Sequence, residues 1–126
     1  NKNPPVSRIM NFGINSMNAG ALNAALRAFN EVIEMDPKFA EGWNKRATIY
    51  YLLQDYPASV KDIAQTLRLE PRHFGALSGL GLINAALGRH RAALKAFEQA
   101  STIHPQMSGV QQHIKMIKEF LKGEKT

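Results

Sequence analysis

The strongest constraint on this chain is a pattern that returns every 34 residues. Three prolines stand at this spacing, Pro37, Pro71 and Pro105. Four further sets share the register: Ala25, Ser59 and Ala93; Phe29, Ile63 and Phe97; Ile9, Trp43 and Leu77; and Gly13, Ala47 and Gly81. A fixed period of about 20–50 residues is typical of stacked supersecondary units, each too small to bury its apolar face alone. The period therefore predicts a solenoid, an architecture that offers binding surfaces and rarely carries chemistry.

Apolar residues at spacings of three and four predict two helices in each period and one helix after the last. After an extended leader from Asn1 to Pro5, the first helix has its inner stripe at Ile9, Phe12, Gly13 and Met17 and ends at Gly20. The second runs from Leu22 to Asp36, and the third carries Trp43 and ends near Gln54. No segment shows sustained strand alternation, so the predicted fold class is all-α.

The later helices have equally clear ends. Asp55 is the expected N-cap of the fourth helix, with Pro57 in its first turn and Val60, Ile63, Ala64, Leu67 and Leu69 as its apolar positions. The fifth helix is expected from Phe74 to Leu87, followed by a break at Gly88. The sixth carries Ala93, Leu94, Phe97 and Ala100 and ends at His104 and Pro105. The last, about Ser108 to Lys122, has no partner after it, and its lysines suit the polar outer side of a cap.

These residues resemble the tetratricopeptide repeat. The matches are Gly13, Gly20, Ala25, Phe29 and Pro37; Trp43, Ala47, Tyr50 and Pro71; and Leu77, Gly81, Gly88, Ala93, Phe97, Ala100 and Pro105. The departures are Ser16, Gln54, Ser59 and Asn84. Segments 41–47 and 70–81 are similar to small, poorly characterised members of the family. The resemblance implies one domain, 1–126: a right-handed α–α superhelix of three repeats, about 6–39, 40–73 and 74–107, plus a capping helix, about 108–122.

The resemblance also implies a concave groove lined by the first helix of each pair, where such proteins usually bind peptides. The residues it places there are Met10, Ile14, Met17, Glu41, Asn44, Lys45, Thr48, Tyr51, Gly75, Ser78, Gly79, Leu82, Gln112 and Met116. The first three are apolar and suit an adaptable contact with a ligand. Ordinary packing against neighbouring helices explains them equally well.

One known mode in this family grips the terminal carboxylate of a chaperone tail with lysine, asparagine and arginine side chains. The corresponding positions here are Met10, Ile14, Lys45, Gly75 and Gly79, of which only Lys45 is cationic. We therefore do not expect binding of chaperone tails by that route.

Three glycines fall within the fifth helix, where each costs roughly 0.8–1 kcal/mol relative to alanine. Gly81 stands where helices of this family press together, so packing explains it. For Gly75 and Gly79 we consider two explanations, a close approach by a partner's backbone and a tolerated loss of stability.

The net charge of +6 is uneven. Residues 1–71 carry 8 Lys/Arg against 7 Asp/Glu, and residues 72–126 carry 8 against 3. A basic half can attract acidic peptides, anionic lipid or nucleic acid. Because no aromatic interleaving accompanies the charge, we favour a solvated surface and do not expect nucleic-acid binding.

Several kinds of chemistry lack their sequence marks. There is no cysteine, and the four histidines do not have the spacing of a metal site. No run approaches the roughly 20 apolar residues of a membrane span. We therefore expect a soluble binding module for a peptide or protein, without cofactor and not an enzyme. The sequence does not indicate a compartment.

Two alternatives to peptide binding remain open at this point. The first is self-assembly, such as a homodimer formed through the apolar side of the last helix, with Met116 and Phe120. The second is binding of an anionic partner by the basic second half.

Overall fold

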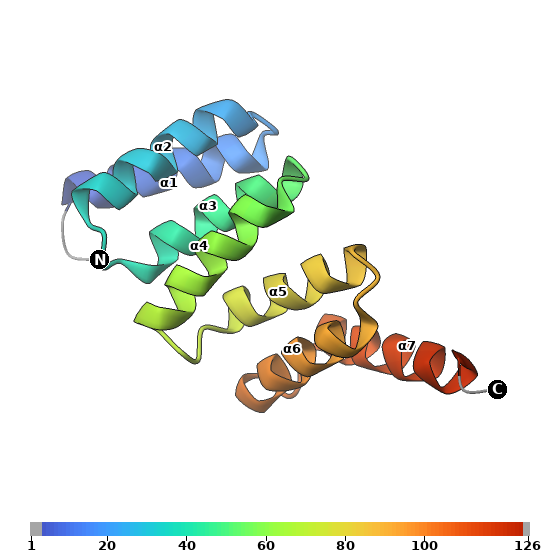
Figure 1. Cartoon of the computed structure of the whole chain (residues 1–126). Helices are drawn as coiled ribbons and strands as arrows, with labels where there is room; N and C mark the ends of the chain where they lie inside the picture. Colours follow the sequence, from blue (N-terminus) through green and yellow to red (C-terminus); the bar gives the residue numbers. More distant parts are fainter. Residues whose placement is uncertain (1–3, 125–126) are drawn as a thin grey trace. The chain divides into compact units, whose positions relative to one another are not determined.

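A computed structural model describes residues 4–124, which form helices and no strands (Figure 1). The helices are α1 (Pro4–Asn18), α2 (Leu22–Met35), α3 (Ala40–Leu52), α4 (Tyr56–Leu69), α5 (Phe74–Ala86), α6 (His90–Ile103) and α7 (Ser108–Glu124). Consecutive helices pair as α1 with α2, α3 with α4, and α5 with α6, and α7 packs on α6. The predicted all-α solenoid of helix pairs with a C-terminal helix is confirmed.

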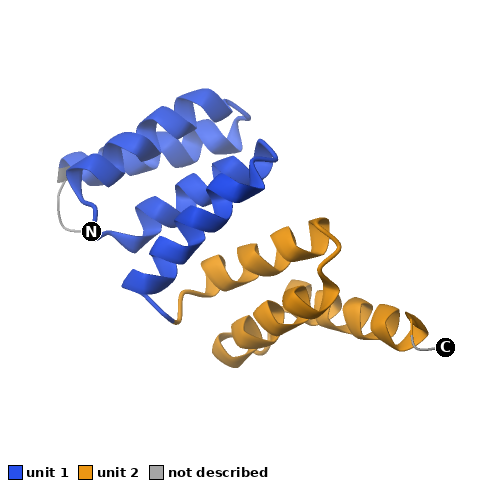
Figure 2. Cartoon of the chain, in the orientation of Figure 1, with its two compact units in different colours: residues 1–71 blue, residues 72–126 orange. Residues whose placement is uncertain are grey.

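The chain divides into two compact units, residues 1–71 and residues 72–126 (Figure 2). The first unit holds two helix pairs, and the second holds one pair and α7. The division falls where the charge balance changes from +1 to +5. The sequence predicted one domain over residues 1–126, and each unit is described below by itself.

Three helices end in the same hydrogen-bonded turn. The last residue of the turn has a positive φ in each case, 82° at Gly20, 63° at Gln54 and 74° at Gly88. Around Gln54 the amide of Asp55 donates to the Tyr50 carbonyl at 2.8 Å, and the Gln54 amide donates to the Tyr51 carbonyl at 2.9 Å. These two hydrogen bonds satisfy backbone carbonyls that would otherwise lack a donor at the end of the helix. Because only glycine adopts a positive φ without steric cost, the middle turn carries strain that the other two lack.

Replacing Gln54 with glycine is expected to stabilise the first unit by about 1 kcal/mol, because it removes that strain. Urea unfolding followed by the fluorescence of Trp43, the chain's one tryptophan, measures the change. Gln54→Ala keeps the strained φ and serves as the control, with little change expected. A glycine variant no more stable than the alanine variant would contradict the prediction.

Two helix starts are fixed by side-chain caps. Asp55 Oδ1 accepts a hydrogen bond from the Ala58 amide at 3.3 Å, and Pro57 lies in the first turn, as predicted. His73 Nδ1 caps α5 by accepting from the Ala76 amide at 3.0 Å, a role the sequence did not indicate. The predicted leader is wrong over Pro4 and Pro5, which begin α1 where proline costs no helix bond. Residues 1–3 lie outside the described part.

The inner faces of two helices differ from the predicted stripes. In α1, Val6 (0% exposed) and Met10 (7%) are buried, whereas Phe12 is 59% exposed. In α4, the predicted positions Val60 and Ala64 are exposed. The buried residues of α4 include three polar ones, Ser59, Asp62 and Thr66. Periodicity alone favours apolar side chains, so it missed polar groups that become buried by finding hydrogen-bond partners.

These buried polar groups are satisfied inside the first unit. Ser59 Oγ donates to the Ala47 carbonyl at 2.7 Å, which ties α4 to α3. Thr66 Oγ1 donates to the Asp62 carbonyl at 2.8 Å, one turn back. A buried hydroxyl without such a partner would cost about 1–3 kcal/mol, so the bonds explain how serine and threonine occupy core positions.

Close helix packing explains two glycines in register. A Cβ added at Gly13 would lie 2.6 Å from Phe29 Cε1, and one at Gly81 would lie 2.7 Å from Phe97 Cε1. Both rings are almost fully buried. In the second repeat, alanine and isoleucine, Ala47 and Ile63, replace glycine and phenylalanine. The expectation that packing requires Gly81 is confirmed.

Candidate functional site

The polar candidate residues of the first unit form one stripe along α3. Its members, Glu41, Asn44, Lys45, Thr48 and Tyr51, are spaced three and four apart and are all half-buried. Asn44 Nδ2 donates to Glu41 Oε1 at 3.1 Å, and Thr48 Oγ1 donates to the Asn44 carbonyl at 3.1 Å. The centroid of the Tyr51 ring lies 5.8 Å from that of Tyr56. The stripe is therefore an ordered polar surface.

Lys45 is the cation of this stripe. Among residues 4–124 its ammonium group has no hydrogen bond or ion pair. It therefore remains available to an acceptor from outside the chain, beside the Asn44 amide.

The apolar candidates on α1 differ in how far they are covered. Met10 belongs to the core cluster around Phe29, whereas Ile14 and Met17 pack against that cluster and keep part of their surface exposed. The sequence left open whether Met10 contacts a ligand or packs in the core, and its position fits core packing. Ile14 and Met17 have surface left for a ligand.

The candidates of the second unit lie on two helices. Gly75, Ser78, Gly79 and Leu82 are on α5, and Gln112 and Met116 are on α7. Met116 is 66% exposed, and Gln112 and Gly75 are also exposed. The Ser78 hydroxyl is buried and has no hydrogen-bond partner within the described residues. A buried hydroxyl without a partner is unfavourable, so this group can gain from an added acceptor or donor.

The first unit also contains a polar cluster that the sequence did not reveal. Arg46 Nε and Nη2 donate to the two carboxylate oxygens of Asp62 at 2.8 and 2.9 Å, and Nη1 donates to Asn30 Oδ1 at 3.0 Å. The guanidinium carbon lies 5.2 Å from the Trp43 ring centroid and 5.7 Å from that of Tyr50. The cluster joins α2, α3 and α4.

The Asp62 side chain is only 4% exposed and that of Arg46 is 20% exposed. The hydrogen bonds from Arg46 to Asp62 raise the pKa of the arginine above its ordinary value, against the opposite effect of burial. One signal could have identified the pair. Arg46 is in register with Phe12 and Leu80, and Asp62 with Ala28 and Ala96, so both partners are polar departures at apolar positions of one repeat.

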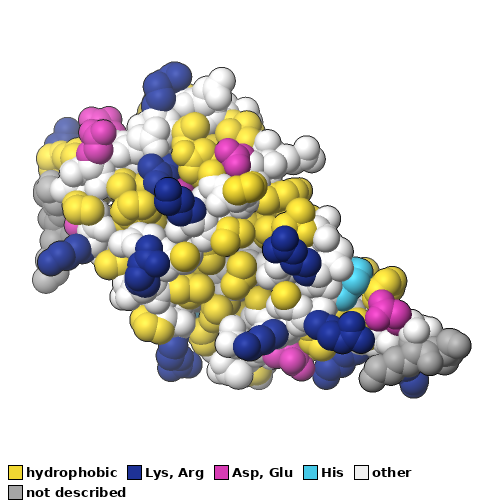
Figure 3. Space-filling model, viewed as in Figure 1, with side chains coloured by type: hydrophobic (Ala, Val, Ile, Leu, Met, Phe, Trp, Pro, Cys, Tyr) yellow, Lys and Arg dark blue, Asp and Glu magenta, His cyan; other side chains and the backbone are white. Residues whose placement is uncertain are grey.

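Charge in the second unit is dispersed. On the face that Figure 3 shows, lysine and arginine side chains mostly stand apart among hydrophobic and neutral atoms. Weak surface ion pairs among the described residues join Lys118 to Glu98 at 3.7 Å and Arg91 to Glu124 at 3.5 Å. Lys115, Lys118 and Lys122 are exposed on α7, as expected for the polar side of a cap.

The histidines have structural contacts. Besides the cap formed by His73, the ring of His104 meets Phe74 edge-on at 4.8 Å, and that of His113 stacks on Phe97 at 4.8 Å. His90 lies against Phe120, with ring centroids 4.1 Å apart. Within residues 4–124, no three His, Asp or Glu side chains gather as a metal site would require, and no helix has the length and apolar character of a bilayer crossing.

Comparison with known sequences gives consistent results. The family model described as "Tetratricopeptide repeat" matches residues 11–63 and 53–108. A TPR repeat-containing protein of Rhizobium etli is 41% identical over 103 residues, which cover 82% of this chain and 50% of that protein. Tetratricopeptide repeat protein 36 of Danio rerio is 32% identical over 95 residues, 72% of this chain and 51% of that protein. The chain thus spans about half the length of these relatives.

Solved structures share the fold at low sequence identity. The first TPR of Spaghetti (RPAP3), bound to the HSP90 peptide SRMEEVD, superposes with a TM-score of 0.87 at 19% identity and covers 93% of each chain. The TPR2B domain of yeast Sti1, in complex with an Hsp70 peptide, has a TM-score of 0.82 at 18% identity, covering 90% of this chain and 96% of that one. At this level of identity the superpositions show a shared fold.

Proposed function

The chain belongs to the tetratricopeptide repeat family. From that premise we propose that it is a binding module in which the first helix of each pair holds a peptide or partner protein. In the first unit the ligand contacts the polar stripe on α3, with Ile14 and Met17 as apolar contacts. In the second unit Gly75, Ser78, Gly79, Leu82, Gln112 and Met116 are the corresponding candidates. The module acts as an adaptor or scaffold.

The observation that carries this proposal is the order of the α3 stripe. Asn44 is held by Glu41, the Tyr51 ring lies beside that of Tyr56, and Lys45 has no partner among residues 4–124. Side chains already fixed before binding lose little conformational entropy when a ligand arrives. Polar groups that face solvent in fixed positions are also the groups that give a peptide site its specificity.

Changing Asn44, Lys45 and Tyr51 together to alanine is expected to weaken partner binding at least tenfold. The measurement begins with capture of partners from a lysate on the unchanged chain, followed by titration of each identified partner against both proteins. The matched control changes three exposed residues of α2 and α4 to alanine. They are an amide, a large apolar side chain and a lysine: Asn23, Met35 and Lys61. Partners kept by the stripe variant and lost by the control would refute the proposal.

We further propose that the ligand is not held by a carboxylate clamp. Of the corresponding positions, Met10 is buried, Ile14 is apolar, Gly75 and Gly79 have no side chain, and only Lys45 carries charge. The two peptide-bound neighbours are under 20% identical, so they show the fold alone. A bound peptide and its C-terminally amidated form should therefore have similar affinities.

Self-assembly is a second candidate, favoured by the apolar surface of α7. Met116 is 66% exposed, and Phe120, beside the buried stripe of Val110, Ile114 and Ile117, is 50% exposed. Exposed apolar patches often mark interfaces. The mass of the protein in solution at several concentrations separates the candidates, because a strict monomer contradicts self-assembly.

A further inference from the structure

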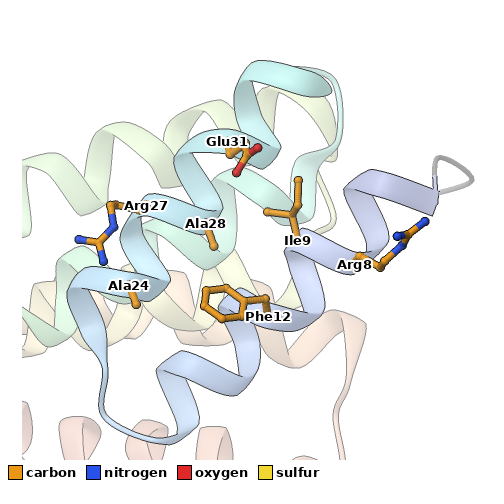
Figure 4. A pocket seen from close by; sticks show the side chains of 7 residues that line it. All are labelled: Arg8, Ile9, Phe12, Ala24, Arg27, Ala28 and Glu31. Atoms are coloured by element: carbon orange, nitrogen blue, oxygen red, sulfur yellow. The ribbon is translucent and has the colours of Figure 1, made fainter.

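A hollow of about 490 Å³ lies on the outer side of the first helix pair. Its lining residues are Arg8, Ile9, Phe12, Ala24, Arg27, Ala28 and Glu31. Figure 4 shows Phe12 and Ile9 on α1 facing Ala24 and Ala28 on α2, with the charged side chains at the edges. Phe12 is the most exposed aromatic ring of the described residues, at 59%. The surface is apolar at its centre and charged at its rim, as interfaces are.

The 34-residue register identifies the corresponding face in the next repeat. Arg8, Ile9 and Phe12 of α1 correspond to Gly42, Trp43 and Arg46 of α3. On α3 these three positions are covered by α2 and the turn that follows it. A Cβ at Gly42 would lie 2.9 Å from Val32 Cγ1, Trp43 Nε1 donates to the Pro37 carbonyl at 2.8 Å, and Arg46 reaches Asn30.

The second unit repeats the same arrangement independently. Val110, Gln111 and Ile114 of α7 occupy the three corresponding positions, and α7 packs there on α6. Gln111 Nε2 donates to the Pro105 carbonyl at 2.8 Å, the counterpart of the bond from Trp43 to Pro37. Both Val110 and Ile114 are buried. In two repeats, then, this face receives the second helix of the preceding pair.

We propose that the open face of α1 and α2, with Phe12 at its centre, is a docking site for an amphipathic helix that lies on α1 as α2 lies on α3. The apolar side of that helix covers Ile9 and Phe12. Its edge is acidic, because the rim of the hollow carries Arg8 and Arg27 against one carboxylate, Glu31. The site is separate from the polar stripe on α3, so the proposal goes beyond peptide binding there.

The test supplies such a helix from the chain itself. A second copy of residues 22–39, which hold α2 and its following turn, is joined directly to Val6 in place of residues 1–5. Val32 of the copy is changed to alanine, the residue that Ala100 supplies on α6, because α1 has Arg8 where α3 has Gly42. This junction reproduces the connection between residue 39 and residue 40, and the copy carries three acidic residues, Glu31, Glu34 and Asp36, against Arg27 and Lys38. The tether also raises the effective concentration of a helix that would be marginal as a free peptide.

The readout is a tryptophan at the centre of the site, introduced by Phe12→Trp in a Trp43→Phe background. We expect the fused helix to shift the emission maximum of this tryptophan to the blue by at least 10 nm and to lower its quenching by acrylamide at least threefold. The reason is that the helix would remove an exposed indole ring from water. The control is the same fusion with Val32→Asp, in place of Val32→Ala, and Ile33→Asp in the added copy only, which removes the apolar face and should leave the emission unshifted.

Three results would overturn the proposal. In the first, the fused helix leaves emission and quenching unchanged. In the second, the aspartate control shifts the emission as far as the intact fusion does. In the third, the original chain forms a dimer in solution that Phe12→Lys returns to a monomer, which assigns the face to a second copy. Because Phe12 is exposed, that variant should fold normally, as circular dichroism will verify.

Discussion

Replacing Arg46 with leucine is expected to destabilise the first unit by about 3 kcal/mol. The change removes the partner of a carboxylate that is 4% exposed, and an uncompensated buried charge typically costs about 3–5 kcal/mol. The lower end applies because the arginine side chain keeps 20% of its surface exposed to solvent. The variant also loses the bond to Asn30 and the cation–π contacts with Trp43 and Tyr50. Urea unfolding followed by Trp43 fluorescence and by circular dichroism measures the loss.

The chain provides its own control for this pair. The third repeat has Leu80 and Ala96 in the positions of Arg46 and Asp62. The double variant Arg46→Leu, Asp62→Ala copies that pair, and we expect it to recover most of the stability because it buries no charge. A single variant as stable as the double variant would contradict this explanation, because the unpaired carboxylate of Asp62 would then not be the cause of the lost stability.

Replacing Gly81 with alanine is expected to destabilise the second unit by about 1–3 kcal/mol, despite the higher helix propensity of alanine. The added methyl would lie 2.7 Å from Cε1 and Cζ of Phe97, whose ring is 1% exposed and has no room to move away. Because the second unit has no tryptophan, hydrogen exchange of the α5 and α6 amides measures the loss.

Two variants test the physical reason for this loss. Gly109→Ala adds a methyl in α7 where nothing lies within 4 Å, so it should leave stability unchanged or raise it by up to about 1 kcal/mol. Gly81→Ala combined with Phe97→Ile copies Ala47 and Ile63 of the second repeat, and we expect it to be more stable than Gly81→Ala alone. Equal losses at Gly81 and Gly109 would show that steric contact is not the cause.

Local features of the sequence predicted the helices well. The ends at Gly20, Asp55 and Gly88 were predicted because turns and caps depend on residues only a few positions apart. The predicted leader is wrong over Pro4 and Pro5, because proline fits a first helical turn as well as an extended segment. The cap by His73 was missed because histidine is not among the usual N-cap residues.

The candidate site was only partly accessible from sequence. The register placed Asn44, Lys45 and Tyr51 on one stripe of α3, as helical geometry requires. It left Met10 undecided, because core and groove positions have the same period and only packing separates them. Whether the stripe binds a ligand is the subject of the binding experiment.

The period, the helix pairs and the family could be predicted from the residues alone, because each depends on spacings along the chain. The small and large residues at Gly81 and Phe97 could also be paired from the repeat. The bidentate pair of Arg46 and Asp62 and the exposure of Phe12 became visible in the folded chain alone. These depend on which neighbouring helix covers each face, and that coverage differs between repeats that share one pattern.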